Sequence, residues 1–193
     1  MGQAEAHYTT TGLDHRKILM WVFLASDCLF FGALISTYMV YRSNVPVGPG
    51  PELFDIPYTS VSAFVLLMSS LTMVLALAAL QRGNSRQARL WLLATALQGA
   101  VFLGGQFYEF NLFVDQGLTL TTSVFGTSFF VLTGFHGTHV AIGVFMLLTL
   151  VGASYMGRLK PKHHLTVELV GLYWHFVDIV WIVIFTVVYL IPS

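Results

Sequence analysis

Long apolar stretches alternate with short polar ones along the whole chain. Five predominantly apolar runs stand out: Ile18–Tyr41, Ser60–Leu80, Leu90–Tyr108, Val124–Tyr155 and Val167–Ile191. About 20 helical residues cross the hydrocarbon of a bilayer, so each run is long enough to span it. An open strand would leave backbone groups unpaired in lipid, and the alternation typical of a membrane barrel is absent. The pattern therefore predicts an all-α bundle of five transmembrane helices.

The polar stretches between the runs are too short for a second domain. Residues 1–17 form a polar N-terminal segment, and residues 18–193 form a single five-helix transmembrane domain. The N-terminal segment lacks the apolar core of a signal peptide, so the first run is interpreted as a span. The stretch Val45–Pro57 is rich in proline and glycine and is predicted to be a loop. The fourth run is the longest and must tilt or extend beyond the bilayer.

Lysine and arginine positions predict the orientation of these helices. Eight of the nine basic residues fall on one side of a five-span topology, and Arg42 alone falls on the other. The loop 109–122 on that second side contains Glu109 and Asp115 and no basic residue. Cytoplasmic loops carry the excess of Lys and Arg, so we expect the N-terminus in the cytoplasm and the C-terminus outside.

Composition supports the same class of protein. Hydrophobic residues make up 56% of the chain and charged residues only 9%, against about 25% charged in a soluble domain. The chain is therefore predicted to be an integral membrane protein. Its formal net charge is zero, which gives no electrostatic basis for a nucleic-acid partner. Its one cysteine, Cys28, has no partner for an internal disulfide and is interpreted as a small hydrophobic residue of the core.

Six ionisable residues fall inside the predicted spans, where charge is costly and points to function or to internal pairing. On the fourth run His136 and His139 are three residues apart, beside the small residues Gly134, Gly137 and Ala141. On the fifth run Glu168, His175 and Asp178 share one helical stripe. Small residues let helices approach closely, so we expect the two histidine-bearing faces to meet. The sixth residue is Asp27, near the middle of the first run.

Three other interpretations of these residues are weaker. A haem or copper site would need histidines repeated on facing helices or a pair of cysteines, and HGTH lacks the glutamate and the spacing of a zinc motif. A proton-coupled transporter is a more serious rival because intramembrane carboxylates mark ion pathways, but no broken helix or repeated half is visible. A nucleophilic enzyme is unsupported because no serine lies in an elbow motif.

Several motifs then resemble one family. The segments GTSFFVLTGFHGTHVAIG (126–143) and HHLTVELVGLYWHFVDIVW (163–181) resemble subunit III of the haem–copper terminal oxidases, the cytochrome c oxidase family. MWVFLASDCLFFGALISTYM (20–39) and LGGQFYEF (103–110) fit the same family in the same order. The resemblance covers the chain from about residue 16 to its end.

The resemblance implies an accessory subunit without a redox centre or active site of its own. It implies a bacterial plasma-membrane complex in which subunit I and other subunits hold the haems and copper, reducing oxygen and pumping protons. The expected role is to stabilise subunit I, to support proton uptake and to bind phospholipid. The five-helix form and the LYWHFVDIVWI ending favour cytochrome c as the electron donor, with a quinol oxidase as the alternative. Seven-helix members have two further spans at the front, which another subunit must supply here for the lipid cleft to form.

The resemblance carries over to a limited set of residues. His136, His139, Glu168, His175, Asp178 and Trp181 match the family pattern, and Arg158 is aligned with an arginine that faces lipid. Asp27 stands where the family usually has glutamate, in SDCLFF. We expect His175 and Asp178 to form a polar clasp between the fifth and fourth helices, or to contact subunit I, rather than to conduct protons. Asp27 has apolar neighbours, which favour the neutral acid, and either assists proton uptake or donates one structural hydrogen bond.

Overall fold

A computed structural model describes residues 14–42 and 54–191. In these ranges the chain is helical, without a β-strand. Its elements are α1 (His15–Tyr41), α2 (Ile56–Gln81), α3 (Ser85–Asp115), α4 (Val124–Tyr155), the short 3₁₀ turn η2 (Pro161–His163), α5 (His164–Phe185) and the π-helical turn η3 (Thr186–Leu190). The five α-helices are long and apolar enough to cross a membrane, which confirms the predicted fold class. Most of the polar N-terminal segment 1–17, and residues 45–53 of the predicted loop, lie outside the described residues.

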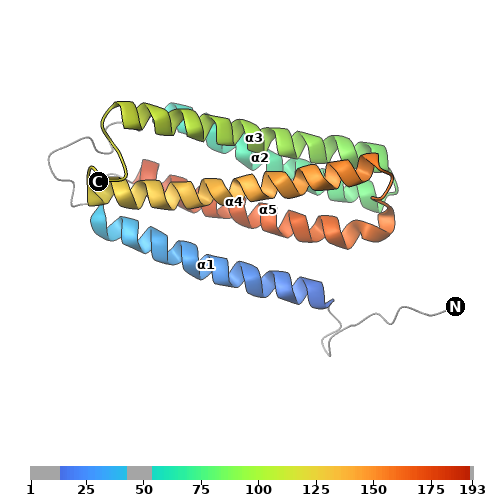
Figure 1. Cartoon of the computed structure of the whole chain (residues 1–193). Coiled ribbons are helices and arrows are strands. Elements are labelled where there is room, and N and C mark those ends of the chain that lie inside the picture. The colour runs from blue at the N-terminus through green and yellow to red at the C-terminus, as the bar shows by residue number, and fades with distance from the viewer. Residues whose placement is uncertain (1–13, 43–53, 192–193) are drawn as a thin grey trace.

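The helix ends follow ordinary capping chemistry. Asp14, Asp55, Asn84 and Ser123 each accept a backbone N–H in the first turn of the helix that follows. Gly83 and Gly157, with φ of 81° and 69°, follow α2 and α4 in the left-handed conformation that lets the chain turn at once. The resulting turns, from α2 to α3 and from α4 to α5, lie at the same end of the bundle (Figure 1).

Two predicted boundaries are wrong. Pro57, predicted in a loop, lies in the first turn of α2, where its missing N–H costs nothing. Glu109, also predicted in a loop, lies inside α3, which continues to Asp115. In both cases polar or helix-breaking residues at the membrane surface were taken for the end of a helix that continues past them.

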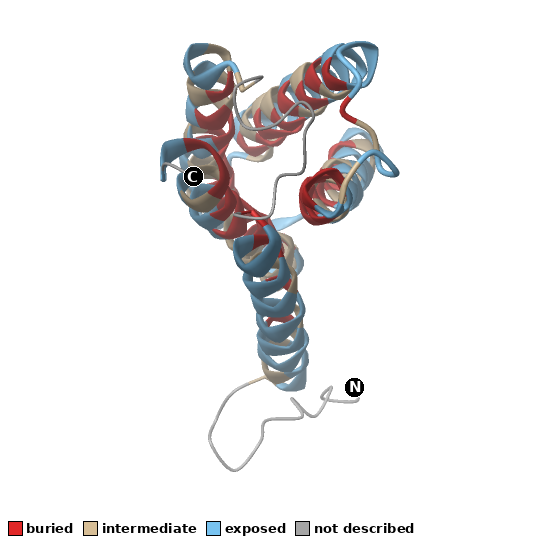
Figure 2. Ribbon diagram, turned by 90° about the vertical axis from the view of Figure 1, so that its left-hand side faces the viewer, coloured by how far each residue is buried: buried red, intermediate tan, exposed pale blue. Residues whose placement is uncertain are grey.

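Four of the helices form a closed ring and the fifth lies outside it. Around the ring, α2 contacts α3, α3 contacts α4, α4 contacts α5, and α5 contacts α2. The main contacts of α1 are with α4 and α5, and α1 stands apart from the other helices at its N-terminal end (Figures 1 and 2). In the most apolar 18-residue stretch of each helix, 11% of the residues are buried in α1 and 33–44% in the other helices. Its buried residues, Leu24, Phe31 and Tyr38, repeat every seven positions and form one narrow stripe.

The ring closes around Trp174 of α5. A Cβ atom added to Gly143 of α4 would lie 2.7 Å from the Trp174 ring, and one added to Gly99 of α3 would lie 2.5 Å from it. The indole Nε1 of Trp174 donates a hydrogen bond of 2.9 Å to Ser69 Oγ on α2. The Trp174 side chain therefore contacts all three other helices of the ring. Glycine is required at the two backbone positions against which its indole packs.

Candidate functional site

His136 lies in the interior of the ring, fully buried. Its Nε2 is 3.2 Å from the carbonyl oxygen of Val177 on α5. A carbonyl can only accept, so Nε2 carries the proton and Nδ1 is an acceptor in the neutral ring. Trp181 lies against this ring with centroids 4.8 Å apart, and Phe102 of α3 contacts both rings edge-on. These contacts make His136 and Trp181 part of the packing between α3, α4 and α5, as the sequence predicts for the α4–α5 contact.

His139, one turn further along α4, faces the seam between α4 and α1. Its Nδ1 donates a 2.8 Å hydrogen bond to the Phe135 carbonyl. Its Nε2 lies 3.7 Å from Asp27 Oδ2, and both side chains are 15% exposed. The distance is too long for a hydrogen bond, but it brings an imidazole nitrogen with a lone pair up to a carboxyl group. The seam thus places an acid and a base side by side, with no hydrogen bond between them.

Asp27 was expected to have only apolar neighbours, and this expectation is wrong. Phe31 does contact the His139 ring edge-on, but the imidazole itself comes from α4. The sequence does not identify Asp27 and His139 as partners, because the two residues are far apart along the chain. A polar residue at mid-span on each of two helices was the only available signal.

His175 and Asp178 of α5 share a partner on α2. The Ser70 hydroxyl donates a short hydrogen bond to Asp178 Oδ2 and lies 3.0 Å from His175 Nδ1. Since the hydroxyl proton is directed to the carboxylate, His175 Nδ1–H is the donor in the second contact. The predicted clasp between the fifth and fourth helices is therefore wrong in its partner helix, which is α2.

The same geometry argues against nucleophilic catalysis at Ser70. In a catalytic triad the serine hydroxyl donates to the histidine, and the acid accepts from the other nitrogen of that histidine. Here the serine donates to the acid directly, so the histidine cannot take the serine proton. The arrangement joins two helices and does not activate a nucleophile.

Glu168 pairs with α1 rather than with the other acids of its stripe. Its Oε1 lies 2.6 Å from Lys17 Nζ, with the two side chains 28% and 31% exposed. The polar residues predicted as one network thus form four separate contacts: His136 with Trp181 and Val177, His139 with Asp27, Ser70 with His175 and Asp178, and Glu168 with Lys17. Arg158 is exposed in the turn after α4, and the lipid contact expected for it stays a prediction.

Ser70, Gln106 and Glu109 are polar residues of the bundle whose contacts sequence reasoning missed. Glu109 is buried and accepts a 2.8 Å hydrogen bond from Thr59 on α2. For Ser70 the sequence did contain a signal of a contact between helices, because SSLT interrupts the second apolar run. Ser and Thr hydroxyls hydrogen-bond across membrane helices.

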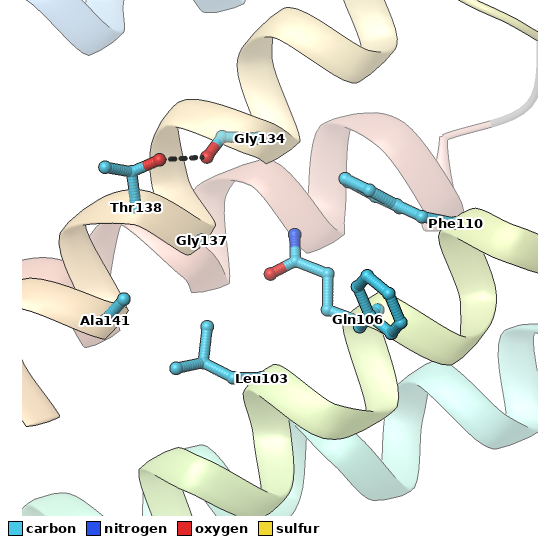
Figure 3. Close-up of a pocket in the computed structure, with 8 residues that line it drawn as sticks. Leu103, Gln106, Phe110, Gly134, Gly137, Thr138 and Ala141 are labelled. Atoms are coloured by element: carbon cyan, nitrogen blue, oxygen red, sulfur yellow. Dashed lines mark hydrogen bonds between the residues drawn. The ribbon is translucent and has the colours of Figure 1, made fainter.

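Gln106 explains the small residues of α4. Its Nε2 donates a 2.9 Å hydrogen bond to the Thr133 carbonyl, and a Cβ on Gly137 would lie 2.7 Å from its Oε1. Figure 3 shows Gln106 directed from α3 toward Gly137, beside Leu103 and Phe110. The helix that approaches Gly137 is therefore α3, whereas a Cβ on Gly134 would meet nothing within 4 Å.

Among the clefts formed by the described residues, two on the outside of the bundle bear on the predicted site. Cys28, expected in the apolar core, is exposed and lines one of them. The first, of about 270 Å³, lies between α3 and α4 and is lined by Leu103, Gln106, Phe107, Phe110, Gly134, Gly137, Thr138 and Ala141 (Figure 3). The second, here named the α1–α5 cleft, has a volume of about 370 Å³ and is lined by Trp21, Leu24, Ala25, Cys28, Leu172, His175, Phe176 and Ile179. Both are mainly apolar. Among the described residues, no three His, Cys, Asp or Glu side chains gather as a metal site requires.

Comparison with known proteins agrees with the motifs. The family model described as "Cytochrome c oxidase subunit III" matches residues 2–193. "Cytochrome c oxidase subunit 3" of Bacillus sp. (strain PS3) is 40% identical over 171 residues, covering 88% of this chain and 83% of the relative. "Cytochrome bo(3) ubiquinol oxidase subunit 3" of Pseudomonas aeruginosa is 38% identical, covering 90% and 83%. "Cytochrome c oxidase subunit 3" of Thermostichus vulcanus is 36% identical and covers 98% of both chains. The chain therefore belongs to the cytochrome c oxidase subunit III family, a multi-pass membrane component of multi-subunit oxidase complexes.

Proposed function

We propose that this chain is an accessory subunit of a proton-pumping haem–copper oxidase in a bacterial plasma membrane, with haem and copper held by its partner subunits. Its role is to stabilise the catalytic subunit I and to support proton uptake there. The observation that carries this role is the pair formed by Asp27 and His139 at the seam between α1 and α4. Both side chains lie in the middle part of their helices, and each is 15% exposed at the surface of the bundle.

An acid and an imidazole that are partly open to lipid are costly. A protein surface that covers the seam removes that cost and gains access to the shared proton. We therefore place the catalytic subunit against the Asp27–His139 side of the bundle. In this position the pair takes up or releases one proton beside the subunit that consumes protons.

Cytochrome c is the proposed electron donor, on the five-helix form and the ending motif. The rival is a quinol, and relatives named for both donors match at 38–40% identity. The donor binds to other subunits, so this chain accommodates either. Oxidation of reduced cytochrome c, and not of a quinol, by the purified complex is the result expected.

The α1–α5 cleft is the proposed site for a phospholipid acyl chain. It is apolar and lies on the outside of the bundle, with Trp21 and Ile179 both 59% exposed at its edges. The turn between α4 and α5, which contains Arg158, is at the end of the bundle where α1 begins (Figure 1). A phosphate headgroup there would have a cation within the interfacial layer.

Purification of the tagged chain from its native membrane tests the proposal. We expect co-purification with a haem-containing catalytic subunit, identified by mass spectrometry and by the visible spectrum of the complex. The chain separated from its partners should carry neither haem nor stoichiometric copper. Purification of the chain alone, with substrate-dependent flux in vesicles, would instead identify a transporter.

Orientation is tested separately. A reporter fused after Ser193 should be active outside the cell, and one inserted at Gly83 in the turn between α2 and α3 should be active inside. The opposite pair of signals would contradict the charge argument and, with it, the proposed side of proton uptake.

A further inference from the structure

The two ends of α1 are held in different ways. At its C-terminal end Arg42 is 8% exposed and donates hydrogen bonds to the carbonyl oxygens of Ile191, at 2.6 Å, and Val187, at 3.3 Å. These carbonyls belong to the last turn before the described residues end, and a cation at the C-terminal end of a helix is also favoured by the helix dipole. At its N-terminal end the polar connection to the ring is the Lys17–Glu168 ion pair, which is about one-third exposed.

The α1–α5 cleft begins directly inside that ion pair. Trp21 is four residues after Lys17 and Leu172 is four residues after Glu168, so each cleft residue lies one turn beyond a member of the pair on the same helix face. Leu24 is the one residue in the first half of α1 that is buried. Besides Leu24, the apolar contacts of this half are the stacking of Phe23 on Tyr173 of α5, with ring centroids 6.3 Å apart, and the packing of partly buried Met20 against the core.

We propose that the Lys17–Glu168 ion pair is a latch: α1 pivots about its Arg42 end, and the latch sets the width of the α1–α5 cleft. The proposal goes beyond the proposed function, because it depends on neither the electron donor nor the proton role. When the pair is closed, the cleft is closed at the end where α1 begins. When the pair is broken, Trp21 and Leu172 separate while the Arg42 end keeps its contacts.

The difference between the two ends makes this movement directional. Hydrogen bonds from a buried guanidinium are stronger than an exposed ion pair, which is weakened further by salt. Phe31 and Tyr38 add buried packing to the Arg42 half of α1. Of the polar contacts at the two ends of α1, the latch is thus the more exposed one, and the cleft beside it is the region that changes.

Cross-linking within the assembled complex tests the latch. Trp21→Cys and Leu172→Cys are combined with Cys28→Ser, and the pair is bridged by bifunctional thiol reagents of short or long span. Cross-linked peptides of this chain are quantified by mass spectrometry. Adding Glu168→Gln should lower the yield with the short reagent by about two- to five-fold and raise it with the long one.

Two further variants complete the design. Arg16→Gln removes a positive charge from the same exposed turn, where no side-chain contact of Arg16 occurs in the described residues, and it should leave the yields unchanged. The exchange Lys17→Glu with Glu168→Lys should restore the short cross-link. Equal yields with and without Glu168→Gln would overturn the proposal, as would an equal effect of Arg16→Gln.

A salt titration keeps the test open if Glu168→Gln does not assemble. In the double-cysteine protein with its latch intact, raising the salt concentration should shift cross-linking from the short to the long reagent. A yield independent of salt would refute a latch made of this exposed ion pair. Oxidase activity is not the readout, so failure of the latch and failure of the proposed function remain distinguishable.

Discussion

His136 and His139 are one helical turn apart on α4 and occupy opposite surroundings. His136 lies inside the ring, fully buried, with its Nε2 bonded to Val177 and its face against Trp181. His139 lies at the seam with α1, partly exposed and facing Asp27. The ring is held by close packing, whereas the seam is held by a few polar contacts. The same residue type therefore packs inside the ring in the first place and lies beside an acid at the seam in the second, where the proton role is proposed.

Gly143→Leu is the strongest way to break the ring. Even a Cβ at this position would lie 2.7 Å from Trp174, which its hydrogen bond to Ser69 holds in place, so overpacking should cost about 3 kcal/mol or more. We expect the chain to be lost from the membrane complex, as measured by immunoblot and subunit composition. Gly152→Leu is the matched control, because a Cβ there meets nothing within 4 Å. Comparable loss in both variants would show that Trp174 does not set the spacing of the ring.

Asp178→Leu should be the next most damaging change. It leaves the Ser70 hydroxyl without its carboxylate acceptor, which costs about 1–3 kcal/mol, and lowers the yield of assembled subunit. Asp178→Asn keeps an acceptor for the Ser70 hydroxyl and should be milder. Equal yields of the two variants would argue against the contact between α2 and α5 at this point.

At the seam, Arg42→Gln should lower the melting temperature of the complex without affecting the ring. Loss of two charge-assisted hydrogen bonds to helix-end carbonyls corresponds to about 1.5–3 kcal/mol at most, reduced where water reaches the site. Arg82→Gln, at an exposed position after α2, is the control and should change little. Faster proteolysis between α2 and α3 in Arg42→Gln would show that the contacts of the ring had weakened as well. That result would contradict the separation of ring and seam.

Asp27→Asn should have the smallest effect on assembly, below about 1 kcal/mol, because the amide has the shape of the neutral acid. If the pair with His139 supplies protons, the variant should assemble normally and turn over more slowly, or inactivate sooner, as pH rises. The sign follows because protons are scarcest at high pH, where loss of a local proton reservoir has most effect. Turnover indistinguishable from the unmodified complex at every pH would leave Asp27 a purely structural residue.

The sequence predicts the helices well because their signal is local. The fourth run, Val124–Tyr155, coincides with α4 in both limits. The third does not, because Arg86 and Arg89 at one end and Glu109 at the other lower the hydropathy of a helix that continues through them. A hydropathy pattern records the thickness of the hydrocarbon layer, whereas the helix itself extends into the interface.

Partners within the bundle are less predictable from sequence. The small residues of α4 show that some helix approaches closely, but Gly137 meets Gln106 of α3 while Gly143 meets Trp174 of α5. Likewise Asp178 shows that a buried polar contact exists, and only the three-dimensional arrangement shows that Ser70 provides it. The order of helices around a ring is not encoded in any one segment, so the partner of each polar residue could not be assigned in advance.

The closed ring has a consequence for the order in which the protein is made. The last helix to be synthesised, α5, contributes Trp174 and closes the ring against α2, and the main partners of α1 are α4 and α5. Helix α1 therefore waits for its main partners until α4 has followed it, while α2, α3 and α4 can associate in sequence. A chain interrupted before α5 would leave Ser69 and the glycine faces of α3 and α4 uncovered in lipid. Membrane quality control has in those surfaces a means of distinguishing an unfinished subunit from one that is ready to join the oxidase.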